Sequence, residues 1–273
     1  MDLDRISRVG TAAAYAGGGV LKKYFGQITD VRKKGRIDLV TRADTEAERK
    51  IIDSIREIYP DHAILAEESG ALAGTGAGPG AGQWIVDPLD GTTNFAHGVP
   101  ICAVSIAFSA DDQTQMGIVF NPFGGEFFSA IRGRGARLNG ASIHVSRVDT
   151  TINALLATGF PYDPMPILGD LMARFAAGIK ASQGIRRLGA AALDLCHVAC
   201  GRFDGFWEQN LKPWDTAAGA LIVTEAGGQV TDFNGQSHEA GCNQILATNG
   251  RIHSQMVTTL SRRRQNGSPV FSS

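Results

Sequence analysis

Apolar residues recur at the spacing of an amphipathic helix in two segments near the start of the chain. The first segment covers residues 2–26 and ends near Gly26. The second covers residues 42–58, and Thr41 or Asp44 can cap its start. Between them, the segment Q-I-T-D-V-R-K-K-G-R-I-D-L-V-T predicts a β-hairpin with Lys-Lys-Gly-Arg at its tip.

Short apolar runs bounded by turn residues follow, and they predict strands. The expected strands cover residues 63–70, 84–86, 101–109, 115–120, 126–131 and 143–146. The segments N-P-F-G-G-E and R-G-R-G-A-R-L-N-G predict turns between them. Strands that follow one another with short turns favour an antiparallel or mixed sheet.

The second half of the chain alternates strands with helices. Expected strands cover residues 153–158, 228–233 and 245–249, and expected helices cover residues 167–180, 189–201, 214–227 and 251–261. The fold class is therefore α+β. We expect an N-terminal half at residues 1–150, a C-terminal half at 151–262 and a disordered tail at 263–273.

Composition narrows the class of protein. The chain has 273 residues, of which 43% are hydrophobic and 19% charged, as in a globular protein. The net charge of −1 gives no reason to expect nucleic acid or an anionic membrane as a partner. No apolar run is long enough to span a bilayer, and the N-terminus lacks the pattern of a signal peptide. We expect a cytoplasmic protein.

Several residues that could suggest other sites are interpreted as structural. Cys102, Cys196, Cys200 and Cys242 form no C-x-x-C pair, so we expect buried free thiols. The segment A-L-A-G-T-G-A-G-P-G-A-G lacks the lysine of a phosphate-binding P-loop and predicts a surface loop. His97 has no partner at ligand spacing, and His197 lies in an apolar helix. A basic group, expected to face solvent, comprises Arg132, Arg134 and Arg137.

The segment W-I-V-D-P-L-D-G-T-T-N-F, residues 84–95, carries the main candidate chemistry. Its apolar start predicts a buried strand that Pro88 ends, which leaves Asp87 and Asp90 at the end of the strand. The following G-T-T-N can open a helix whose free N–H groups bind phosphate. Carboxylates bind hard cations such as Mg²⁺, so the turn combines both halves of a metal–phosphate site. An ordinary turn that caps a helix is the alternative.

Other acids favour the metal site over the simple turn. Glu67 and Glu68 follow a predicted strand, and Asp44 and Asp215 lie at predicted helix starts. That is more acid than one helix cap requires. The D-x-D-G-T motif of the haloacid-dehalogenase type does not fit, because its nucleophilic aspartate would fall on Pro88.

With these residues in place, the sequence resembles the inositol monophosphatase family of Mg²⁺-dependent, Li⁺-sensitive sugar phosphatases, in its bacterial branch. The resemblance runs from about residue 5 to 260. Its motifs are A-E-E-S (66–69), W-I-V-D-P-L-D-G-T-T-N-F (84–95), W-D-T-A-A-G-A-L-I-V-T-E-A-G-G (214–228), D-L-V-T-R-A-D (38–44), A-T-G-F-P (157–161) and R-R-L-G-A-A-A-L-D-L (186–195). It implies a layered α-β-α-β-α fold, a homodimer, and hydrolysis of a phosphate monoester by a metal-activated water.

The resemblance also implies roles for individual residues. The metal ligands of the family match Glu67, Asp87, Asp90, Asp215 and the carbonyl of Leu89. The catalytic positions match Thr92 and Asp44, which orient the water, and Glu68, a further acid behind the ligands. Phosphate would be held at Gly91 and Thr92, and a loop lysine matches Lys33 or Lys34.

For the substrate, the family pattern implies Glu208, Asp90, Asp215 and the backbone near Ala191. Glu208 can accept hydrogen bonds from the adjacent hydroxyls of a polyol, which favours inositol 1-phosphate. Lys212 stands where animal members carry a histidine, and we expect it to face solvent. Fructose 1,6-bisphosphate, histidinol phosphate and nucleotide 3′-phosphates are alternative substrates. A regulatory binding protein that keeps the fold without catalysis is the alternative from another class.

Overall fold

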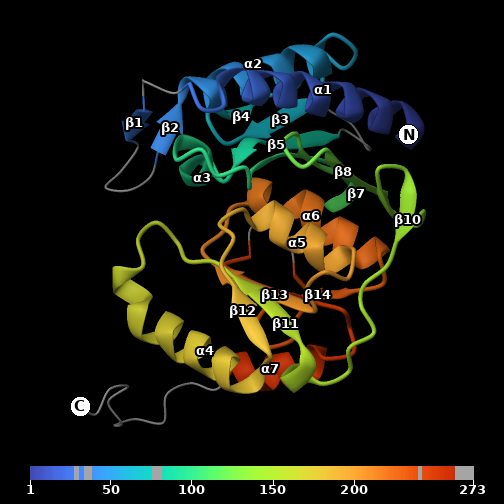
Figure 1. The fold of residues 1–273 in the computed structure, drawn as a ribbon. Coiled ribbons are helices and arrows are strands. Elements are labelled where there is room, and N and C mark those ends of the chain that lie inside the picture. The colour runs from blue at the N-terminus through green and yellow to red at the C-terminus, as the bar shows by residue number, and fades with distance from the viewer. Residues whose placement is uncertain (28–30, 34–38, 76–81, 239–241, 262–273) are drawn as a thin grey trace.

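The computed structural model describes residues 1–27, 31–33, 39–75, 82–238 and 242–261, and it has five layers (Figure 1). Helices α1 (Leu3–Tyr24) and α2 (Arg42–Arg56) cover one face of an eight-stranded sheet. Helices α5 (Ala191–Ala199) and α6 (Pro213–Glu225) form the middle layer. A five-stranded sheet follows, and α4 (Leu168–Ala181) and α7 (His253–Ser261) lie on its far side. The expected α+β class and the α-β-α-β-α layering are confirmed.

The eight-stranded sheet has the order β10-β9-β8-β7-β6-β5-β3-β4. Its strands are β3 (Ala63–Ala66), β4 (Gly70–Leu72), β5 (Gln83–Asp90), β6 (Ala103–Ala110), β7 (Gln113–Asn121), β8 (Glu126–Ile131), β9 (Ala136–Leu138) and β10 (Ala141–Ile143). Only β3 and β5 pair in parallel within it, so the expected meander is confirmed. The predicted turn around residue 137 instead holds β9, and the strand expected at 143–146 ends at Ile143.

The five-stranded sheet has the order β12-β11-β13-β15-β14. Its strands are β11 (Leu155–Thr158), β12 (Gly184–Arg186), β13 (Gly205–Gln209), β14 (Gln229–Thr231) and β15 (Gln244–Thr248). The pattern analysis missed β12 and β13. Strand β13 is buried at all five positions, so its sequence lacks the alternation of polar and apolar residues by which a half-exposed strand is recognised.

The middle layer explains why α6 is apolar almost all round. This helix packs on β6 and β7 of one sheet, on β14 and β15 of the other, and on α5. Its Leu221, Ile222 and Val223 are buried at successive positions, which no one-sided amphipathic helix shows. The two sheets therefore share one helical layer between them.

The remaining elements are short. Strands β1 (Val31–Lys33) and β2 (Leu39–Thr41) pair antiparallel, as the predicted hairpin requires, and the tip of that hairpin lies outside the described residues. Helix α3 (Thr92–Ala96) has little more than one turn, and two 3₁₀ turns cover Thr151–Asn153 and Met165–Ile167. Among the described helices, none is long and apolar enough to cross a membrane.

Candidate active site

The acidic turn does not end β5 at Pro88 as predicted. The strand runs on to Asp90, but its pairing with β6 shifts by one residue between Asp87, which lies opposite Ser105, and Asp90, which lies opposite Ala103. Proline cannot donate to the ladder, so it is accommodated at an irregularity instead of stopping the strand. The result is a bulged strand end that carries both aspartates.

The backbone after the bulge fixes two of the predicted catalytic groups. The amide of Leu89 donates to Asp87 at 2.9 Å. The Thr92 hydroxyl lies 3.1 Å from Oδ1 of Asp44 and 3.0 Å from the carbonyl oxygen of Leu89. Thr92 and Asp44 are both buried, at 4% and 0% exposure. The structure thus brings together the pair expected to orient a water molecule, although they are 48 residues apart in sequence.

Gly91 caps α3 in a conformation that suits only glycine. Its φ is +90°, in the left-handed region. A side chain there would also lie 2.9 Å from the Ile101 carbonyl oxygen and 3.2 Å from Cβ of Cys102. The backbone at Gly91 and Thr92 is therefore held closely against the neighbouring segment.

Asp90 connects the acidic turn to the middle helical layer. Its carboxylate accepts hydrogen bonds from the amides of Ala191, at 3.2 Å, and Ala192, at 2.8 Å. These are among the first N–H groups of α5, which have no partner within their own helix. The amide of Ala191, a predicted substrate contact, is thus already bonded to Asp90.

Asp215 occupies the first turn of α6. Its Oδ2 accepts from the amide of Lys212 at 2.6 Å and so caps the helix. The side chain of Lys212 is exposed, in agreement with its interpretation as a solvent-facing residue.

Glu67 and Glu68 follow β3 and lie beside the end of β5. The amide of Glu67 donates to the carbonyl of Val86 at 3.1 Å. The buried carboxylate of Glu48, on α2, accepts from the amides of Glu68 at 2.8 Å and Ser69 at 2.9 Å. Sequence reasoning passed over Glu48, although an acid on the apolar side of a predicted helix was a signal available in the sequence.

The acids act on one another electrostatically. Burial, followed by the charges of Glu67, Asp90 and Asp215, raises the pKa of Asp87 well above its usual value. Burial raises the pKa of Asp90 to about 7, against the hydrogen bonds from the α5 amides. It raises the pKa of Asp215 to about 7, against the bond from Lys212, and that of Glu208 to about 8. These carboxyl groups share one electrostatic environment in which full ionisation is unfavourable.

The predicted loop lysine is not placed beside these acids. The side chain of Lys33, and all of Lys34, lie outside the described parts of the structure. Over the described residues, no three or more His, Cys, Asp or Glu side chains lie in an arrangement that could hold a metal ion as they stand.

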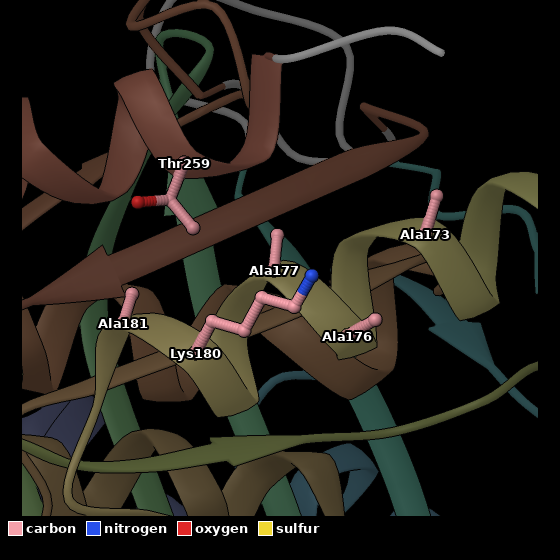
Figure 2. A pocket seen from close by; sticks show the side chains of 6 residues that line it. All are labelled: Ala173, Ala176, Ala177, Lys180, Ala181 and Thr259. Carbon is pink, nitrogen blue, oxygen red and sulfur yellow. The ribbon is translucent and has the colours of Figure 1, made fainter. Parts of the chain in front are cut away.

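The groove that the structure shows on its surface is separate from the acids of the candidate site. A groove of about 470 Å³ between α4 and α7 is lined by alanines, Lys180 and Thr259 and holds no acid (Figure 2).

His97 is exposed, and His197 packs against Phe203. The three arginines of the basic group are exposed. All four cysteines are free; Cys102 and Cys196 are buried as expected, whereas Cys200 and Cys242 are only partly so.

Comparisons with known proteins show which proteins this chain resembles. A model of the inositol monophosphatase family matches residues 2–265. The chain is 44% identical over 261 residues to a protein from Synechocystis sp. named inositol-1-monophosphatase, covering 95% of this chain and 90% of that one. It is 45% identical over 235 residues to Nus factor SuhB of Pseudomonas aeruginosa, covering 85% and 86%. The solved inositol monophosphatase of Anabaena (Nostoc) sp. superposes with a TM-score of 0.85 at 40% identity, covering 95% and 96%.

Proposed function

Because this chain belongs to the inositol monophosphatase family, we propose that it is a Mg²⁺-dependent phosphate monoesterase that hydrolyses inositol 1-phosphate. Family membership supports phosphatase activity and dependence on a metal ion. The identity of the metal and of the substrate rests on the residues of the site.

The observation that carries the proposal is the crowding of carboxyl groups from separate elements. Asp87 and Asp90 come from β5, Glu67 follows β3 and Asp215 begins α6, and the charges of the other three raise the pKa of Asp87. Acids that repel one another in a buried site are stabilised by a hard cation, which prefers oxygen ligands. These four acids and the Leu89 carbonyl are the groups that would hold Mg²⁺.

The neighbouring residues suit hydrolysis by water. When bound, Mg²⁺ neutralises phosphate charge and lowers the pKa of a water molecule. The Thr92 hydroxyl donates a hydrogen bond to Asp44 or to the Leu89 carbonyl, so its oxygen can accept a hydrogen bond from the attacking water. The proton released by that water passes toward Asp44 or Glu68. The backbone of Gly91 and Thr92, at the start of α3, would hold the phosphate.

The substrate proposal rests on Glu208. It lies on β13 at 8% exposure, and burial, followed by the charge of Asp215, raises its pKa, while Arg187 opposes the rise. Hydroxyl groups can donate to its carboxyl oxygens, whereas a buried acid offers a second phosphate no positive charge with which to pair. This favours a polyol monophosphate over fructose 1,6-bisphosphate. The test is Mg²⁺-dependent phosphate release from a panel of esters; equal or faster turnover of histidinol phosphate or fructose 1,6-bisphosphate would contradict the choice of inositol 1-phosphate.

Asp87→Asn tests the assignment of the site. The substitution keeps the size of the side chain and removes the charge shared with the other acids, so we expect phosphate release to fall at least about a hundredfold. Asp53→Asn, on the exposed face of α2, is the matched control and should keep full activity. Near-normal activity of Asp87→Asn would contradict the assignment of these acids to the active site.

A second candidate function comes from the similarity to proteins named Nus factor SuhB, at 41–45% identity in several bacteria. This chain could share a role of that kind with or without catalysis. Replacing the native gene with the Asp87→Asn variant separates the two, because a regulatory role independent of catalysis survives the substitution and a role that needs hydrolysis does not.

A further inference from the structure

At the Glu208 end of the site, the position of the carboxyl group depends on residue 159 being a glycine. Strands β11 and β13 run in parallel, with Thr158 beside Trp207, so Gly159 and Glu208 are the next residues on each. A Cβ atom built on Gly159 would overlap the carboxyl carbon and both carboxyl oxygens of Glu208. The acid group of Glu208 therefore occupies the space where any other residue 159 would place its side chain.

Asp194 is a second buried acid, and the charge of Glu208 acts on it. Asp194, in α5, is 1% exposed, and no described residue forms a hydrogen bond with its Oδ1. Burial, and next the charge of Glu208, raise the pKa of Asp194 well above its usual value, while Arg187 opposes this. A buried carboxyl oxygen without a partner is unfavourable, so this one calls for a donor.

We propose that Gly159 and Asp194 are positioning residues that hold the Glu208 carboxyl for a substrate with adjacent hydroxyl groups. The proposal rests on the proposed function. Gly159 provides the room into which the Glu208 carboxyl turns. Asp194 is a second buried acid that interacts with that carboxyl through its charge, and its Oδ1 has no hydrogen-bond partner among the described residues. A polyol supplies hydroxyl donors to such a pair of acids, and an ester without hydroxyl groups cannot.

The test compares inositol 1-phosphate with p-nitrophenyl phosphate, which has no ring hydroxyl groups. In Gly159→Ala and in Asp194→Asn, we expect the ratio of kcat/KM between the two esters to fall about tenfold, mainly through the KM for inositol 1-phosphate. Gly19→Ala, on the exposed side of α1 with no atom within 4 Å of the added Cβ, is the control and should leave the ratio unchanged.

A double variant separates positioning from general damage. Aspartate at position 208 is one methylene shorter, so its carboxyl group no longer fills the space beside Gly159. We therefore expect Gly159→Ala to change the ratio little when it is added to Glu208→Asp, although it changes the ratio in the wild-type background. Additive losses in the double variant would count against the proposal.

Each outcome of these measurements either supports or contradicts the positioning role. If Gly159→Ala and Asp194→Asn slow both esters by the same factor, the residues serve folding only and the proposal is overturned. If Gly159→Ala does not fold, the isosteric Asp194→Asn gives the answer alone. A wild-type protein that hydrolyses neither ester with Mg²⁺ overturns the proposed function and the positioning role together, whereas active wild type with unchanged variant ratios overturns only the positioning role.

Discussion

At the scale of single residues, the Thr92 hydroxyl is the smallest group on which the proposed chemistry depends. It has one proton and two acceptors within reach, Asp44 and the Leu89 carbonyl. Because it can donate to only one of them at a time, its oxygen keeps lone pairs with which it can accept a hydrogen bond. The hydroxyl is therefore restricted to a few orientations by its buried partners, which a freely rotating serine or threonine on a surface is not.

This argument predicts different results for two substitutions of Thr92. Thr92→Val keeps the shape and removes the hydroxyl, so kcat for inositol 1-phosphate should fall by about a hundredfold or more while KM changes little. Thr92→Ser keeps the hydroxyl and should retain most of the activity. Steady-state kinetics with both variants provide the check, and equal losses in the two would mean that the methyl group, not the hydroxyl, is what matters.

At the scale of elements, the sequence predicted best those elements whose patterns are local. Helices α1 and α2 have one apolar face, and both lie within a few residues of their predicted positions. The prediction that Pro88 ends β5 was wrong, because a strand can pass a proline by shifting its register. Strand β13 was not predicted, because burial on both faces removes the alternation of polar and apolar residues that marks a strand.

The same reasoning separates the parts of the site that could be predicted from those that could not. The acids of the site were found because they stand at the ends of elements, where a charge needs an explanation. The roles of Glu48 and Gly159 depend on contacts with residues 20 or more positions away, which no local pattern contains. The division into halves at about residue 150 stays a prediction.

The middle helical layer leads to a prediction about stability. Ile222 of α6 is fully buried between the sheets, so Ile222→Ala should lower the free energy of unfolding by about 2–4 kcal/mol. Thr224→Ala, on the exposed side of the same helix, should change it by less than about 0.5 kcal/mol.

Urea unfolding followed by fluorescence and by circular dichroism gives both values. Because α6 packs on both sheets, the two signals should change in a single transition. Two separate transitions would show that the halves unfold independently, against this prediction.

At the scale of the whole molecule, the buried acids couple stability to pH and to metal. The folded protein raises the pKa of Asp90 and Asp215 to about 7 and that of Glu208 to about 8, whereas the unfolded chain ionises these groups near pH 4. Without metal, their contribution to stability is therefore fully present below about pH 4 and is lost as the pH rises through about 7 to 8. The proposed Mg²⁺ would bind the ionised form and so oppose that loss.

The expected result is a rise in the midpoint of thermal unfolding on adding Mg²⁺ that is small at about pH 6 and larger at about pH 8. The control is Asp87→Asn, in which the Mg²⁺-dependent rise should shrink at every pH. A rise of the same size at both pH values in the wild-type protein would contradict the coupling.

The shared helical layer also sets an order of events during synthesis. The strands of the eight-stranded sheet are complete at Ile143, but the helix that covers its inner face ends at Glu225, 82 residues later. At a typical rate of translation this interval lasts roughly 4 to 16 s. During that time Ile85, Val119 and Phe128, which end in the core beneath α5 and α6, lack the cover that α6 provides. A ribosome that stalls within this stretch would therefore leave an apolar sheet face exposed to solvent and to aggregation until α6 emerges.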